Sequence, residues 1–138
     1  MPSIAFAVVV LGALLPACGR KTIPKAPELV RPKTIDTLEV LQAETGAKLS
    51  WRRPDEYADG SNMPDLGTFT VERAEGDGPF HAIQTLPVTD HERFQKIRRL
   101  HYTDSTVSAG TRYRYRVLSS TLDDYVSEPS NVVEFVLP

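Results

Sequence analysis

The sequence predicts an all-β fold, a sandwich of about seven strands over residues 36–138, on the basis of three observations. Apolar and polar residues alternate in seven short runs, which is the period of strands with one buried face. Turn-forming glycines separate several of these runs, at 59–60, 76–79 and 109–110. No stretch repeats its apolar residues with a clear helical period.

The alternation assigns an inward face to most of the predicted strands. In chain order these strands cover 37–42, 47–52, 68–73, 80–84, 97–103, 111–117 and 131–136. Leu49 and Trp51 share one face of the second strand, and Phe69 and Val71 share one face of the third. These four side chains are therefore predicted to lie in the core.

The plainest alternation is in the sixth strand, 111–117. Its inward face is predicted to carry Tyr113, Tyr115 and Val117, and its outward face Arg112, Arg114 and Arg116. In the fifth strand either Leu100 or Tyr102 points inward.

An uncharged stretch covers residues 3–17 and ends at Cys18, the only cysteine of the chain. It is shorter than the roughly 20 apolar residues of a transmembrane helix and fits the apolar region of a signal peptide. Leu15-Pro16-Ala17-Cys18 resembles the lipobox of bacterial lipoproteins, with an aliphatic residue three before the cysteine and a small residue directly before it. The resemblance implies cleavage after Ala17 and a diacylglyceryl thioether on Cys18, which would anchor the chain in a membrane.

By the same resemblance, Gly19 in place of an aspartate favours the outer membrane of a Gram-negative cell, with the domain facing the periplasm or the exterior. The alternative is that residues 3–17 form a buried strand and Cys18 is a core thiol. The proline- and lysine-rich tract after Cys18 favours the signal peptide. The sequence therefore predicts a signal peptide over 1–17.

Residues 18–35 are predicted to be a linker, because Pro24, Pro27 and Pro32 favour extended backbone. Residues 19–35 carry five Lys or Arg and one Glu, a net charge of +4. Residues 36–138 carry 11 Lys or Arg and 17 Asp or Glu, a net charge of −6. An acidic domain lacks the clustered bases that nucleic acid requires, so no nucleic-acid partner is expected.

The spacing within 36–138 also resembles a known family. The motifs are Leu49-x-Trp51-x-x-Pro54, Phe69-x-Val71-x-Arg73, Val107-x-x-Gly110-x-x-Tyr113-x-Tyr115-x-Val117 and Ser127-x-Pro129-Ser130. Together they look like a fibronectin type III domain, an immunoglobulin-like sandwich. The resemblance implies that Trp51 is the core tryptophan of the second strand and that Tyr113 forms a tyrosine corner. It implies a fold and not a function, because this architecture has many unrelated roles.

No catalytic, cofactor or metal site is predicted. The chain has no Gly-rich phosphate loop, no Gly-x-Ser-x-Gly and no His-Glu-x-x-His. His81, His91 and His101 lie ten residues apart, which matches no local metal-ligand spacing. An acidic group could supply oxygens to calcium but lacks the pattern of a calcium loop, so solvated loops are favoured. Its members are Asp55, Glu56, Asp59, Asp65 and Asp77.

The three outward arginines of the sixth strand form a basic stripe that could bind a polyanion such as lipopolysaccharide phosphate. The favoured interpretation is that they pair across the sheet with acids such as Glu72 or Glu134.

These features predict a membrane-anchored envelope lipoprotein that presents a non-catalytic protein-interaction module. The expected partner is another envelope protein, bound through strand edges or loops. One alternative is a carbohydrate- or peptidoglycan-associated accessory protein, which would need exposed rings at Tyr57 or Tyr125. A structural spacer is the other alternative.

Overall fold

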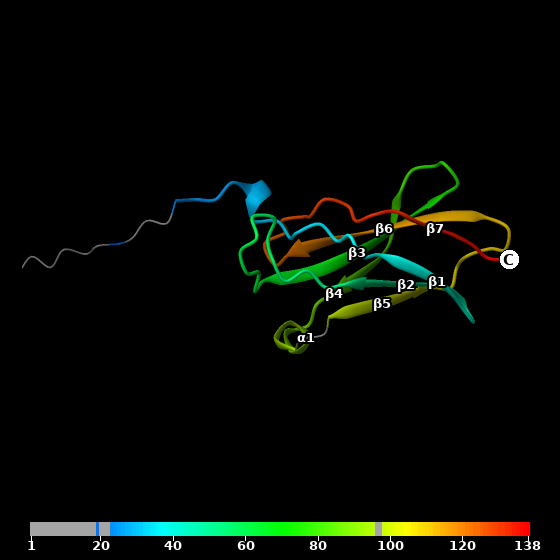
Figure 1. Ribbon diagram of the computed structural model, residues 1–138, viewed down its shortest axis with the longest axis horizontal. Helices are drawn as coiled ribbons and strands as arrows, with labels where there is room; N and C mark the ends of the chain where they lie inside the picture. Colours follow the sequence, from blue (N-terminus) through cyan, green and yellow to red (C-terminus); the bar gives the residue numbers. More distant parts are fainter. Residues whose placement is uncertain (1–18, 20–22, 96–97) are drawn as a thin grey trace, which may run out of the picture.

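Two antiparallel β-sheets face each other and enclose the core (Figure 1). The computed structural model describes residues 19, 23–95 and 98–138. The first sheet has the order β1-β2-β5 and consists of β1 (Glu39–Ala43), β2 (Gly46–Arg52) and β5 (Arg99–Asp104). The second has the order β4-β3-β6-β7 and consists of β4 (His81–Pro87), β3 (Leu66–Glu75), β6 (Arg112–Thr121) and β7 (Val133–Val136).

The predicted β-sandwich is confirmed, and each of the seven predicted strands overlaps an observed one. Strand β6 shows why the alternation of apolar and polar residues predicted the strands: every second residue along it is buried. Tyr113, Tyr115 and Val117 point into the core as predicted, and the arginines between them are only half-buried. Val117 lies opposite Val71 of β3, so the apolar faces of the two central strands are in register.

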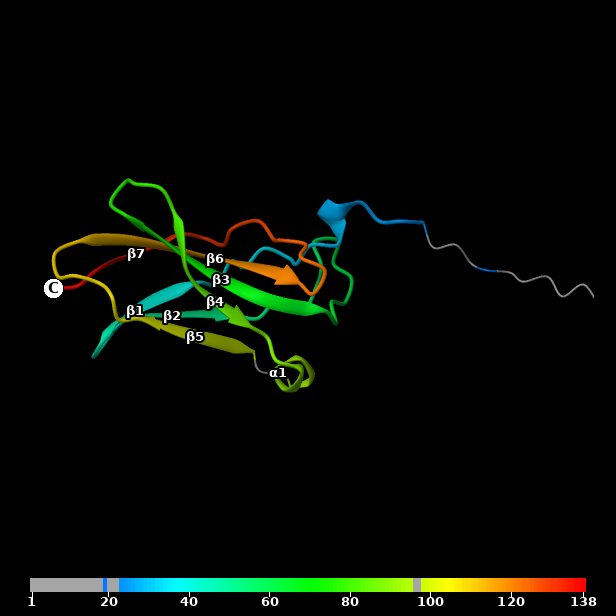
Figure 2. The same cartoon turned by 180° about the vertical axis from the view of Figure 1, so that it is seen from behind.

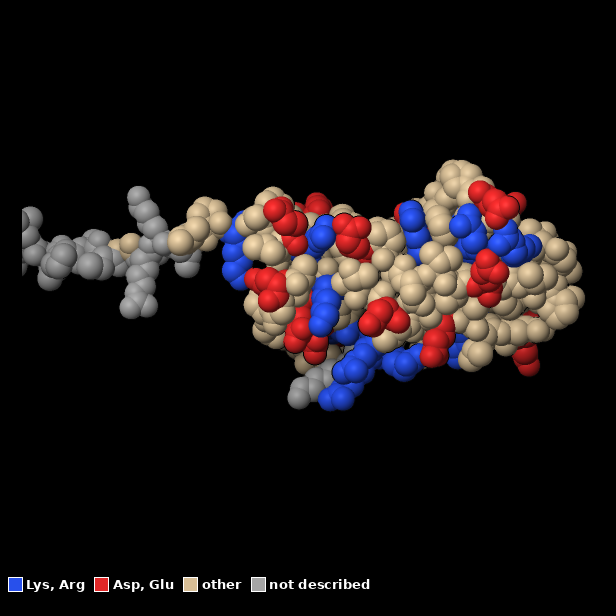
Figure 3. Space-filling view, turned by 45° about the horizontal axis from the view of Figure 1, so that its top comes forward, with Lys and Arg blue, Asp and Glu red and all other residues tan. Residues whose placement is uncertain are grey.

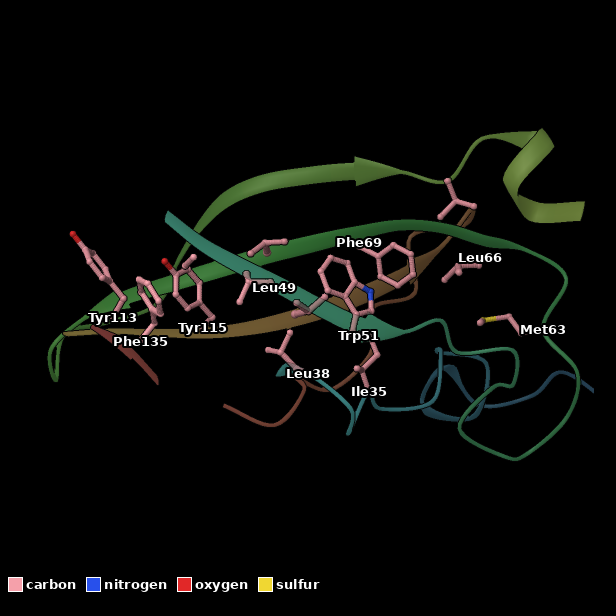
Figure 4. Packing of buried hydrophobic residues seen from close by; sticks show 14 residues of the cluster. Ile35, Leu38, Leu49, Trp51, Met63, Leu66, Phe69, Tyr113, Tyr115 and Phe135 are labelled. Carbon is pink, nitrogen blue, oxygen red and sulfur yellow. The ribbon is translucent and has the colours of Figure 1, made fainter. Parts of the chain in front are cut away.

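The core is centred on Trp51, which is fully buried between the sheets (Figure 4). Its ring meets Phe69 of the opposite sheet edge-on, with the ring centroids 5.6 Å apart. Leu49 and Val71 are also fully buried, which confirms all four inward assignments in β2 and β3. Truncating a buried aromatic such as Trp51 to alanine costs about 3–5 kcal/mol, so this contact is a main source of stability.

A tyrosine corner ties the connection between β5 and β6 to the sandwich. The backbone N–H of Ser108 donates to the hydroxyl oxygen of Tyr113, with an N···O distance of 2.8 Å. The Tyr113 ring itself is almost fully buried. The role that the resemblance implied for Tyr113 is therefore present in the structure.

The described residues also include two short helices, and the alternation pattern did not predict either. Helix α1 (Asp90–Phe94) follows β4, and the 3₁₀ helix η1 (Pro27–Leu29) precedes β1. A capping box starts α1: the Thr89 hydroxyl accepts from the Glu92 N–H, and the Glu92 carboxylate accepts from the Thr89 N–H. Five residues are too few to show a helical period. Within the described part of the chain, no helix combines the length and apolar character needed to cross a membrane.

Part of the predicted linker packs against the sandwich. Pro32 forms a bridge with Tyr57 and is fully buried, and Ile35 is only 4% exposed. Further along, the Asn131 side chain accepts from the Leu38 N–H at 3.0 Å and donates to the Leu38 carbonyl at 2.9 Å. The contacts of the folded unit therefore begin several residues before residue 36.

Candidate functional site

One end of the sandwich gathers several loops that carry exposed and charged side chains. This loop end comprises η1, the 53–65 loop, α1 and the segment 121–131. Figures 1 and 2 show that the N-terminal segment, in blue, leaves the domain at this end and that the C terminus lies at the other. Any ligand bound here would therefore meet the domain on the same side as the segment that leads to Cys18.

Ion pairs and backbone hydrogen bonds hold the N-terminal segment to the loop end. The Arg31 guanidinium lies 2.8 Å from the Glu128 carboxylate, and Lys25 lies 2.9 Å from Asp59. The N–H of Ala58 donates to the carbonyl of Arg31 at 2.9 Å. The direction in which the chain leaves the domain is therefore fixed by several separate contacts.

The predicted acidic group is dispersed among structural partners. Hydrogen bonds from Ser61 and Lys25 hold the pKa of Asp59 below its usual range. Burial, together with the hydrogen bond to Asp65, raises the pKa of Tyr57 to about 12. Glu56 pairs with Lys33, Asp77 pairs with Arg112 at the far end, and Asp55 lines a pocket described below.

The three histidines considered as metal ligands, His81, His91 and His101, are exposed. Among residues 19, 23–95 and 98–138, no group of three or more His, Cys, Asp or Glu is placed to hold a metal ion. Cys18 and Ala17 lie outside the described residues.

The arginine stripe of β6 is engaged as predicted by acids of the neighbouring strands. Arg112 lies 2.9 Å from Glu134 of β7, and Arg116 pairs with Glu72 of β3. Arg114 differs, because it donates to the carbonyls of Gly76 and Gly78, both at 2.8 Å. The stripe therefore uses its hydrogen-bond donors on acids of the neighbouring strands and on the turn between β3 and β4.

The β6–β7 loop at the loop end holds apolar side chains out into solvent. Leu122 is 57% exposed, Val126 is 52% exposed and Tyr125 is 39% exposed. Backbone bonds brace the loop: Thr121 N–H donates to the Tyr125 carbonyl at 3.0 Å, and Leu122 N–H to the Asp65 carbonyl at 2.8 Å. A braced loop loses little conformational entropy when it binds, so these side chains are preorganised for contact.

The two tyrosines considered for glycan binding have different surroundings. Tyr57 packs against the core and is bonded through its hydroxyl to Asp65. Tyr125 is the more accessible ring and lies in the β6–β7 loop.

A pocket of about 520 Å³ opens beside α1 and was not predicted from the sequence. Its lining includes four arginines, the carboxylate of Asp55 and the ring of Phe94; the arginines are Arg52, Arg53, Arg93 and Arg98. We call it the arginine pocket. The sequence contains only a weak indication of this pocket, namely the two arginine pairs 52–53 and 98–99. One pair lies at the end of β2 and the other at the start of β5, and the two become neighbours only because these strands pair.

Two of these arginines are fixed by backbone carbonyls. Arg53 donates to the Glu92 carbonyl at 2.7 Å, and Arg93 donates to the carbonyls of Leu66 and Val88, both at 3.1 Å. Burial and the nearby charge of Arg93 lower the pKa of Arg53. Carbonyl bonds position a guanidinium without cancelling its charge, so the pocket keeps a positive wall.

Several solved structures share this arrangement of two sheets. A fibronectin-III-like protein from Clostridium thermocellum superposes with a TM-score of 0.54 at 22% identity, covering 78% of this chain and 94% of that one. The chain has the fibronectin type III fold. The third fibronectin III domain of the human KIAA0343 protein gives a TM-score of 0.55 at 8% identity, with 87% and 93% of the two chains covered.

The fibronectin type III fold is also matched within larger proteins. The twitchin kinase region from C. elegans gives a TM-score of 0.55 at 15% identity, and the match covers 78% of this chain but only 17% of that one. No family model matches the chain, and no curated protein matches it by sequence. At these identities the likeness concerns the fold, so the function has to be argued from this chain's own residues.

Proposed function

We propose that this chain is an envelope lipoprotein, anchored through Cys18, whose fibronectin type III domain is a non-catalytic protein-interaction module. The observation that carries the interaction role is the braced β6–β7 loop with its exposed Leu122 and Val126. Exposed apolar side chains on a rigid support are typical of binding surfaces.

Support for the anchor comes from the N-terminal sequence and from the place where it joins the domain. The uncharged stretch 3–17 and Leu15-Pro16-Ala17-Cys18 have the features of an exported, lipid-modified protein. The chain enters the domain at the loop end, through contacts such as Arg31–Glu128. An anchored domain would then present its β6–β7 loop on the side that faces its own membrane.

Support for a non-catalytic role comes from how the ionisable side chains are used. The most buried carboxylate, Asp104, is bonded to Arg73, Tyr115 and Thr106, which leaves it no free position for a substrate. Other charged groups, such as Glu72 and Asp59, serve in pairs that hold strands or loops together. A catalytic site would need groups of complementary roles, such as a nucleophile beside a base, whereas the titratable groups that line the arginine pocket are four arginines and one carboxylate.

Site-specific crosslinking tests the interaction role. A photo-crosslinking side chain at Val126 is compared with one at Leu41, which is 66% exposed on the outer face of β1 and serves as the matched control. In membranes of the expressing bacterium we expect one discrete adduct from position 126 and none from position 41. Leu122→Ser should abolish that adduct without unfolding the domain, since Leu122 is exposed. Equal or diffuse labelling from both positions would contradict the proposal.

A further inference from the structure

Two like charges face each other across neighbouring strands of the first sheet. Arg52, the last residue of β2, lies directly opposite Arg99, the first residue of β5. Like charges in this position destabilise a sheet, so their presence calls for compensation. Arg99 receives it from Glu39, whose carboxylate lies 3.1 Å away.

Arg52 and its neighbours are not compensated in this way. Every Asp and Glu of the chain lies in the part that the structure describes. None of these carboxylates forms an ion pair, at 4.0 Å or less, with Arg52, Arg53 or Arg98. The Arg53 N–H donates to the Arg98 carbonyl at 2.8 Å, which brings the two arginine pairs together beside α1. On a domain of net charge −6, positive charge is thus concentrated at one place.

The surface of the domain agrees with this description. In Figure 3, blue and red atoms are interleaved over most of the visible face, and several blue groups lie together along part of the lower edge. Asp55 is the single carboxylate in the lining of the arginine pocket, against four arginines. Arg93 has an ion-pair partner in Asp90, but that side chain is 88% exposed, so solvent screens it.

We infer that the arginine pocket binds a phosphate group. Guanidinium forks match the oxygens of phosphate in a bidentate manner. Arg53 and Arg93 form a wall that is already fixed by backbone carbonyls, and Arg52 and Arg98 are exposed at the rim, where their donors can close on a ligand. The oxygens of one phosphate group can accept from more than one guanidinium fork at once.

The rim of the pocket indicates what the phosphate could be attached to. Phe94 lines the pocket and is 85% exposed, so its ring can contact an apolar portion of the ligand. The pocket also lies at the loop end, where the chain leaves toward Cys18. A phospholipid headgroup and a free phosphate share the chemistry that the arginines recognise; the lipid as source rests on the proposed membrane anchor.

Arginine-specific labelling of the full chain in neutral detergent micelles tests the inference. Phenylglyoxal modification is read residue by residue by mass spectrometry, with inorganic phosphate, micellar phosphatidylglycerol or a glutamate-rich peptide as the added probe. We expect several-fold protection of Arg52 and Arg98 and none of Arg112, which lies at the far end. Protection by inorganic phosphate shows that the phosphate group suffices, and protection by phosphatidylglycerol alone identifies a lipid headgroup.

Two results would overturn the inference: no protection by either phosphate probe, or protection by the acidic peptide alone, which would indicate a protein ligand. In Arg52→Gln the protection curve of Arg98 should move roughly tenfold to higher ligand concentration. Lys48→Gln, which removes the same charge from an exposed position of the same strand, should leave the curve unchanged. Running the Cys18→Ser protein in parallel separates this result from the lipid anchor, since the pocket should be protected with or without it.

Discussion

Asp104 at the end of β5 and Arg73 of β3 join the two sheets through a partly buried ion pair, with Arg73 Nη1 2.9 Å from Asp104 Oδ2. The Asp104 side chain is only 1% exposed and also accepts from the Tyr115 hydroxyl at 2.8 Å. Thr106 donates to its other oxygen through both its N–H and its hydroxyl. The carboxylate of Asp104 therefore links β3, β5, β6 and the loop that follows β5.

Removing the charge of Asp104 should destabilise the domain. Asp104→Asn leaves the partly buried Arg73 with only the exposed Glu75, 3.9 Å away, as a counter-charge, and breaking such a pair costs about 3 kcal/mol in the free energy of unfolding. Urea unfolding at neutral pH measures this loss. Asp123→Asn, at an exposed loop position, is the control and should unfold like the wild type.

The same carboxylate should make stability depend on pH. Burial acts to raise the pKa of Asp104, but hydrogen bonds from Thr106, Tyr115 and Arg73 outweigh it and lower the pKa. Because the folded pKa lies below the unfolded value of about 3.9, the stabilisation is complete above that value and is lost as the pH falls through the folded pKa. Thermal melts between neutral and acid pH should fall more steeply for the wild type than for Asp104→Asn. Parallel curves would contradict this role.

The tyrosine corner gives a second stability test with a matched control. Tyr113→Phe removes the hydroxyl that accepts from the Ser108 N–H and should cost about 1–2 kcal/mol, since that N–H loses its partner. Among the described residues the Tyr102 hydroxyl has no hydrogen-bond partner, so Tyr102→Phe should have little effect. Equal losses in the two variants, measured by urea unfolding, would show that the hydrogen bond from the Ser108 N–H contributes nothing beyond the loss of a hydroxyl.

Two isoleucines test whether the folded unit begins before residue 36. Ile35 is 4% exposed and packs in the core, so Ile35→Ala should lower the free energy of unfolding by about 2–4 kcal/mol. Ile23 is 88% exposed, and Ile23→Ala should leave the free energy of unfolding unchanged. If the two variants melted alike, residues 31–35 would not belong to the cooperative unit.

The fold could be predicted largely because strands with one buried face have a visible period. Trp51, Phe69 and Tyr115 stand at alternating positions, and all three are in the core. Helix α1 was not predicted because its five residues show no helical period, although Thr89 and Glu92 form a capping-box pattern that indicates a helix start. Packing of Pro32 and Ile35 against the domain depends on tertiary contacts that a proline-rich composition does not reveal.

The candidate sites were harder to predict, because both depend on residues distant in sequence. Arg53 and Arg93 are 40 positions apart and meet only because α1 folds back beside the end of β2. The β6–β7 loop is held in place by backbone hydrogen bonds, and the bond from the Leu122 N–H to the Asp65 carbonyl has no sequence signature. Local motifs could be found from the sequence, whereas surfaces assembled by topology could not.

The lipid anchor on Cys18 is the central claim, and intact mass with membrane fractionation tests it most directly. The full chain is expressed in a bacterial host beside Cys18→Ser, with Thr22→Ser as a control near the same site. We predict that the wild type and Thr22→Ser lose residues 1–17, gain the mass of a lipid and fractionate with membranes. Cys18→Ser should do none of these. A wild-type protein that keeps residues 1–17, or is soluble and unmodified, would contradict the account.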